Sequence, residues 1–364
     1  MESLGAGRVP YPGFHALQES FQNQPEVLLD SERLAPFVEE PSHKKYLEND
    51  VYHRYLKMHK VAVNSSGAKE LFEIGAELSG EYMPQYKDAA AWAYAESGLL
   101  DRSASTVERV RRVSLAERQW SEALEIEAQL QSTEYSAIFT EPDTQYRLAI
   151  ALAYTPLMKS VIVGNVTSGV RKQVLEDTTL FGAEIAEQIT RYGDAGNREM
   201  VNGFIGLSHE LNALTALLYM DDPRYVPFPS TARADSGYYH PQQTHDIMVL
   251  NQHWGTIKKV IPIEIKARPS RRDRLRYKSL LVRGKMHLTA EGVDPRMTAR
   301  SFARLQHDEA SLQDIVDIEK ISTDLREMLR LYQKGVTPES LAVNSMTRFY
   351  SSKELDRRYP EIAA

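Results

Sequence analysis

Apolar residues recur at every third or fourth position through most of the chain up to Tyr219, the spacing that gives an α-helix one buried face. The longest uninterrupted pattern begins after Ser105 and opens with Val107 and Val110. The pattern predicts helices over Pro41–Val63, Ala68–Leu78, Tyr86–Leu99, Ser105–Leu130, Thr144–Met158, Val170–Tyr192, Glu199–Tyr219 and Glu309–Lys334. We expect Pro156 to strain its helix, because proline cannot donate the helical hydrogen bond. Residues 1–165 are therefore predicted to be all-helical.

The pattern changes between Thr244 and Arg268, where two short apolar runs flank the polar break Gln252–Gly255. Runs of this length bounded by polar residues are typical of β-strands. The break is short enough for an antiparallel hairpin. Pro262 lies within the second run, and because proline has no N–H to donate, it predicts an edge, a bulge or an unpaired side at that position.

The predicted hairpin carries charged residues that an ordinary buried strand would not need. Glu264 and Lys266 are two positions apart, so they leave the same face of the second strand, while Ile263 and Ile265 leave the other. Asp246 stands at the head of the partner strand and can face them. Carboxylates held on rigid backbone are costly unless they bind something, and a divalent cation is the natural ligand. The alternative is a structural ion pair of Glu264 with Lys266 or Arg268.

The arrangement of Asp246 followed by Glu264-Ile265-Lys266 on the next strand resembles the PD-(D/E)XK phosphodiesterase superfamily of restriction-endonuclease-like nucleases. The resemblance covers roughly residues 167–335. The helix before the strands carries Glu210, which matches the acid that this family often has on its first core helix. His245 stands where the proline of the family name would be.

Together, the periodicity and this resemblance predict an α+β chain in three parts. An all-helical N-terminal region, residues 1–165, would bind a partner or guide a substrate and could form a homodimer. Residues 166–335 would form an α/β restriction-endonuclease-like core, a mixed sheet flanked by helices. Residues 336–364 would be a helical tail.

The same resemblance implies a Mg²⁺- or Mn²⁺-dependent nuclease, an endonuclease or exonuclease that hydrolyses phosphodiester bonds in nucleic acid. DNA is the expected substrate, with RNA as the alternative. Asp246, Glu264, the main-chain carbonyl of Ile265 and Glu210 would hold the metal ion. Lys266 would orient the attacking water and offset charge on the phosphorus.

The charge distribution favours a nucleic-acid partner. Residues 258–304 hold 14 Lys or Arg against four acids, a net of +10, so the rest of this chain of net charge −6 carries −16. Such a block next to an acidic site suits a phosphate backbone, with Arg268, Arg271, Arg272 and Lys278 as the binding residues. A solvated basic surface is the alternative explanation.

Other chemistries are less well supported by the residues. The chain has no cysteine, which excludes a thiolate nucleophile and a cysteine-based zinc site. His209-Glu210 lacks the second histidine of a zinc protease motif, because Ala213 occupies that position. His245-Asp246 mimics an HD-type phosphohydrolase pair but lies on a predicted strand.

The other expectations concern location and alternative functions. The longest apolar run, Leu148–Met158, is too short to span a bilayer, and we expect a cytoplasmic protein without membrane contact. Two other functions stay open: a catalytically inactive nuclease fold that binds nucleic acid, and a helical scaffold that docks a protein partner.

Overall fold

The computed structural model describes residues 31–39, 45–46, 48–58, 65–132, 142–220, 222–229, 247–253, 256–266, 286–289 and 326. The helices are α2 (Ser31–Glu39), α4 (Asp50–Met58), α5 (Ser65–Leu78), α6 (Pro84–Leu100), α7 (Thr106–Ser132), α8 (Pro142–Ala153), α9 (Thr155–Ile162), α10 (Ser168–Asp194) and α11 (Arg198–Tyr219). The strands are β1 (Tyr225–Pro229), β2 (Ile247–His253), β3 (Thr256–Lys266) and β4 (Met286–Thr289). Most of the described residues are therefore helical.

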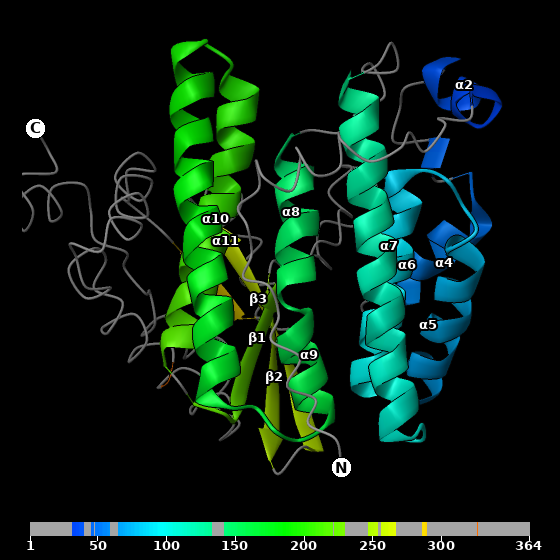
Figure 1. Ribbon diagram of the computed structural model, residues 1–364, viewed down its shortest axis with the longest axis vertical. Coiled ribbons are helices and arrows are strands. Elements are labelled where there is room, and N and C mark those ends of the chain that lie inside the picture. Colours follow the sequence, from blue (N-terminus) through cyan, green and yellow to red (C-terminus); the bar gives the residue numbers. More distant parts are fainter. Residues whose placement is uncertain are drawn as a thin grey trace, which may run out of the picture.

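The helices form two groups joined by α8 and α9 (Figure 1). In the first group α6 packs against both α5 and α7, and α4 covers α5. In the second group the long helices α10 and α11 pack against each other, and α11 also contacts β1 and β3. Among the described residues, no helix is both long enough and apolar enough to cross a membrane.

Polar side chains cap the starts of α10 and α11. Thr167 precedes α10, and its side chain accepts a hydrogen bond from the backbone N–H of Val170. Asn197 caps α11 in the same way through the N–H of Met200. Such side chains satisfy backbone donors that the first helical turn leaves without a partner. Gly196, just before this cap, has a φ of 74°, which a glycine adopts without strain. The predicted helices in these regions are confirmed.

The prediction of one helix over Thr144–Met158 is wrong. The chain forms α8 and α9 with a break at Tyr154. Pro156 lies in the first turn of α9, where its missing N–H would have had no helical partner in any case. The proline therefore begins a second helix and does not strain the middle of one.

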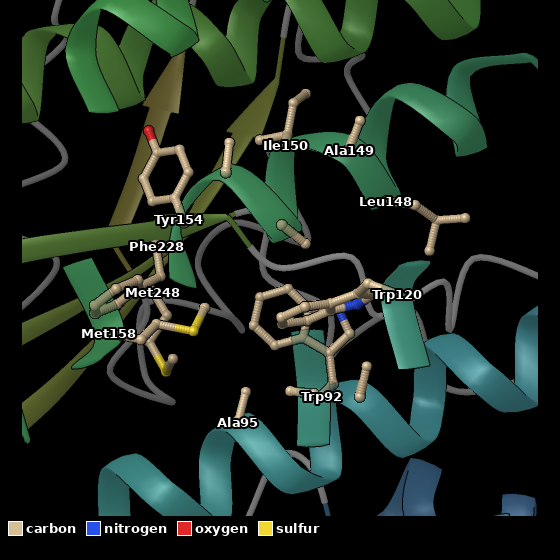
Figure 2. Close-up of a cluster of buried hydrophobic side chains, with 14 of the residues drawn as sticks. Trp92, Ala95, Trp120, Leu148, Ala149, Ile150, Tyr154, Met158, Phe228 and Met248 are labelled. Atoms are coloured by element: carbon tan, nitrogen blue, oxygen red, sulfur yellow. The ribbon is translucent and has the colours of Figure 1, made fainter. Parts of the chain in front are cut away.

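A continuous hydrophobic core links the helices to the sheet (Figure 2). Trp92 of α6 and Trp120 of α7 meet edge to face with ring centroids 5.1 Å apart. On the sheet side, Tyr154 meets Phe228 of β1 with centroids 6.4 Å apart. Met248 of β2 pairs with Phe228 across the sheet and is also buried. The same core therefore stabilises the bundle and fixes the position of β1 and β2.

The strands form one sheet in the order β1-β2-β3-β4. β1 pairs antiparallel with β2, and β2 pairs antiparallel with β3. The four-residue β4 pairs parallel with β3. Of the three alternatives predicted for Pro262, a bulge is not present there, because the ladder irregularity lies between Asn251 and Gln252. Pro262 pairs with Met248 of β2. On the other side of β3, the described pairing with β4 begins one residue later, at Ile263. The β3–β4 pairing therefore requires no N–H from Pro262.

The predicted fold class, an α+β chain with a restriction-endonuclease-like core, is wrong for the described residues. Helices dominate them, and the strands form a small layer along α8–α11, not the centre of an α/β core. The regular ladder is mainly antiparallel, and the described β3–β4 contact spans four residue pairs. The large apolar surfaces of α6, α7, α10 and α11 are buried mostly against other helices, so these contacts organise the core.

Candidate functional site

The β2–β3 hairpin is the element on which the predicted site depends, and it forms where the sequence predicts it. Ile247 pairs with Ile263 and Val249 pairs with Ile261 in an antiparallel ladder. Ile247 and Val249 are fully buried, because their strand is anchored by the core below it. The hairpin thus supplies the rigid backbone that a site at its end requires.

Glu264 and Lys266 occupy alternate positions near the end of β3. In the parallel pair with β4, Glu264 lies beside His287 and Lys266 lies beside Thr289. Local sequence patterns did not place His287 at the site. The missing information was the pairing of β4 with β3, which involves residues more than twenty positions apart.

Several predicted site residues lie outside the described residues. These are Asp246 and the four predicted phosphate-binding residues Arg268, Arg271, Arg272 and Lys278. Within the described part of the chain, no group of three or more His, Asp or Glu side chains is placed to hold a metal ion. Ile265 and Glu264 are adjacent on β3, so the backbone carbonyl and the carboxylate expected to share the ion come from one strand.

Glu210 lies on α11 as expected, but its carboxylate is already bound by another side chain. This residue is only 8% exposed and receives two hydrogen bonds from Arg147 of α8. Arg147 Nη1 is 2.6 Å from Oε2, and Arg147 Nη2 is 2.8 Å from Oε1. Two parallel bonds between a guanidinium and a carboxylate are among the strongest polar contacts in proteins. Arg147 therefore occupies one acceptor site on each oxygen of the Glu210 carboxylate.

A second carboxylate completes the cluster around Arg147. Asp143, one turn earlier on α8, accepts a hydrogen bond of 3.4 Å from Arg147 Nε. Gly203 of α11 faces Asp143, and a Cβ at this glycine would lie 3.6 Å from the carboxyl carbon. Asp143 and Arg147 have the spacing of a helical ion pair, so the sequence pattern indicates this contact. The partnership with Glu210, 63 residues away, does not follow from that spacing.

Arg171 of α10 joins the second helix pair to the sheet. Its guanidinium donates to the main-chain oxygens of Leu217 and Leu218 and to that of Tyr225 at the start of β1, and the residue is 2% exposed. The last carbonyls of a helix have no helical partner and carry partial negative charge, which a buried cation satisfies. Arg171 thereby fixes the end of α11 relative to β1.

The turn between α11 and β1 is held by Asp222 and Arg224. Three hydrogen bonds join the Arg224 guanidinium to the Asp222 carboxylate, the shortest at 2.6 Å. Burial acts to raise the pKa of Asp222, but the hydrogen bonds and charge of Arg224 outweigh it, so the pKa lies below its ordinary value. Gln252 of β2 donates from its side chain to the main-chain oxygen of Pro223, 2.8 Å away. These contacts anchor the hairpin to the helical part of the molecule.

The β3 strand has a further anchor in the first helical group. Arg102, in the turn between α6 and α7, donates to the main-chain oxygen of Ile257. Asp101 beside it is fully buried and accepts from Arg112 at 2.9 Å and from the Ser103 hydroxyl at 2.6 Å. The turn end of the hairpin is therefore held by contacts with both helical groups.

In comparisons with known proteins, no protein-family model, no curated protein and no solved structure matches this chain.

Proposed function

We propose that this protein is a metal-dependent nuclease whose active site lies at the end of the β2–β3 hairpin. The observation that supports the proposal is the register of the hairpin, in which Ile247 pairs with Ile263. Asp246 directly precedes Ile247, and Glu264 directly follows Ile263. If the antiparallel register continued by one residue, Asp246 would lie opposite Glu264, and one cation could then bind both carboxylates.

The donor set suits a hard divalent cation. Two carboxylates and the main-chain carbonyl of Ile265 offer oxygen ligands alone, which Mg²⁺ and Mn²⁺ prefer over the nitrogen and sulfur ligands of zinc sites. When bound, such an ion polarises a phosphate and lowers the pKa of a bound water. Glu210 is not needed for this set, since Arg147 already satisfies both of its oxygens.

Lys266 and the basic block have separate tasks in this proposal. Lys266, two positions after Glu264 on the same strand, orients the attacking water and offsets the negative charge that develops on the phosphate oxygens. Arg268, Arg271, Arg272 and Lys278 bind the phosphate backbone without reading its sequence. DNA is the proposed substrate.

The decisive experiment compares cleavage and binding in point variants. Purified protein is incubated with supercoiled plasmid, single-stranded DNA and RNA in Mg²⁺, Mn²⁺ or EDTA. We expect metal-dependent cleavage that collapses in Lys266→Ala and Glu264→Ala. Lys172→Ala is the matched control, because this α10 lysine has a side chain 77% exposed and pairs loosely with Glu176 at 3.8 Å. Unchanged cleavage in Lys266→Ala or Glu264→Ala would remove these residues from the active site.

Binding measurements separate the alternatives. Nucleic-acid affinity should survive Lys266→Ala, because binding depends on the basic block. It should fall steeply as salt rises, with a shallower slope when Arg271 and Arg272 are both neutralised. Salt-sensitive binding without cleavage in the wild type would favour a nucleic-acid-binding protein without enzymatic activity. The absence of both would favour a helical scaffold that binds a protein partner.

A further inference from the structure

A small pocket lies between α4, α6 and α8, far along the chain from the hairpin. It has a volume of about 30 Å³. Its lining comes from Tyr52, Tyr55, Leu56, Pro84, Gln85, Asp88, Ala89, Thr144 and Leu148. A single water needs roughly 10–15 Å³ of such space, so the pocket has room for about two groups of that size.

Two polar atoms on the pocket wall are buried and have no hydrogen-bond partner within the described part of the protein. They are Oε1 of Gln85 on α6 and Oγ1 of Thr144 on α8. Thr144 is 8% exposed. A buried polar atom that makes no hydrogen bond is destabilising, so these two atoms are available to bond a group held in the pocket. The Gln85 oxygen can only accept a hydrogen bond, which requires an occupant that donates.

The other polar group of the wall is a carboxylate. Asp88 accepts a hydrogen bond of 3.0 Å from the indole N–H of the fully buried Trp120. The rings of Tyr52 and Tyr55 form another wall, stacked with centroids 6.3 Å apart. Aromatic faces beside a carboxylate are the surroundings in which proteins bind organic ammonium ions.

The electrostatic surroundings of the pocket are negative. Burial raises the pKa of the Tyr55 hydroxyl well above its ordinary value, and the carboxylates of Glu96 and Asp88 raise it further. Glu96 is itself 2% exposed on α6. The first turn of α8 brings partial positive charge near Thr144, but this is smaller than the full negative charge of Asp88 in the pocket wall. A cation is therefore favoured over an anion or a neutral molecule.

We propose that this pocket binds a primary ammonium group of about the size of methylammonium. The ammonium hydrogens would be accepted by Gln85 Oε1, Thr144 Oγ1 and Asp88, and the carbon end would contact the tyrosine rings and Leu148. This site is independent of the proposed nuclease function, since all of its residues lie on the helical side of the molecule.

The indole N–H of Trp120 provides a direct readout, because it donates to Asp88 at the pocket wall. The protein labelled with ¹⁵N is titrated with methylammonium chloride, and the Trp120 side-chain resonance is followed. Methanol serves as the neutral probe of equal size, and sodium chloride controls for ionic strength. We expect a saturable shift with methylammonium and none with the two controls.

Variants then test each contact. Asp88→Asn keeps an oxygen for the Trp120 indole but removes the charge, and it should weaken methylammonium binding by about tenfold, the effect of losing one charge-assisted hydrogen bond. Thr144→Val keeps the side-chain shape and should weaken binding by a smaller factor. Glu73→Gln, at an exposed position of α5, removes the same charge away from the pocket and should change nothing. Equal shifts with methanol, or wild-type affinity in Asp88→Asn, would overturn the proposal.

Discussion

The buried ion pair between Arg147 and Glu210 permits the sharpest test of how this fold is held together. Replacing Arg147 by Met removes the guanidinium but keeps a long apolar side chain. Glu210 then loses both hydrogen-bond donors while it remains 8% exposed, and Asp143 stays nearby with the same charge. Breaking a buried pair from one side costs about 3–5 kcal/mol. Because the Arg147 side chain is 18% exposed, we expect a loss near the lower end, about 3 kcal/mol.

The reverse substitution should cost less. Glu210→Leu leaves Arg147 with Asp143 as a partner at 3.4 Å, so the charge of the guanidinium is not stranded. We expect a loss of about 1–2 kcal/mol for this variant, in the range for a lost buried hydrogen-bond partner. The double variant, Arg147→Met with Glu210→Leu, should be more stable than Arg147→Met alone, because the Glu210 carboxylate is then no longer buried without its donor.

Urea unfolding measures these differences through the fluorescence of Trp92 and Trp120, which are 1% and 0% exposed and report loss of the core. The control is the surface pair of Arg54 and Glu77, whose side chains are 45% and 47% exposed. Glu77→Gln should cost no more than about 1 kcal/mol. If Arg147→Met costs no more than this control, or if the double variant equals the sum of the two single losses, the cluster is not a coupled buried pair.

Helix packing and pH dependence provide further tests. Gly98→Ala should destabilise by about 1–3 kcal/mol in urea unfolding, because the new Cβ would lie 2.7 Å from a main-chain oxygen of α7. At Gly206 an added Cβ would meet nothing within 4 Å, so Gly206→Ala should leave the stability unchanged or raise it by about 0.5–1 kcal/mol. A similar loss of stability in the Gly98 and Gly206 variants would contradict the packing argument. Burial raises the pKa of several tyrosines in the folded protein. The stability that they contribute is therefore present below about pH 10 and is lost as the pH rises toward their pKa values in the folded state. Absorbance at 295 nm should show this loss as late, cooperative ionisation of the tyrosines. These tyrosines are Tyr46, Tyr55, Tyr86, Tyr146 and Tyr154. Burial acts to raise the pKa of Asp101, but hydrogen bonds from Ser103 and Arg112 outweigh it and lower that pKa. The stabilising effect of Asp101 should therefore be lost as pH falls below about 4, and Asp101→Asn should flatten that part of the stability profile.

Local sequence patterns are sufficient to predict helices α5, α6, α7, α10 and α11 and the hairpin. A helix buries one face when apolar residues recur every three or four positions, and the starts of α10 and α11 are marked by Thr167 and Asn197. The hairpin follows from two apolar runs with a short polar break. These features depend on residues close together in the chain, so a single sequence is enough to find them.

The packing of the core, and the contacts between charged residues that are far apart in the sequence, are decided only by the tertiary structure. The predicted α/β core was wrong because periodicity shows that a helix has an apolar face but not whether another helix or a sheet covers it. Glu210 looked available for a metal ion because its partner, Arg147, lies 63 residues earlier on another helix. His287 comes beside Glu264 only through the pairing of β4 with β3. Contacts between distant segments depend on the packing of whole elements, and no local pattern of residues specifies them.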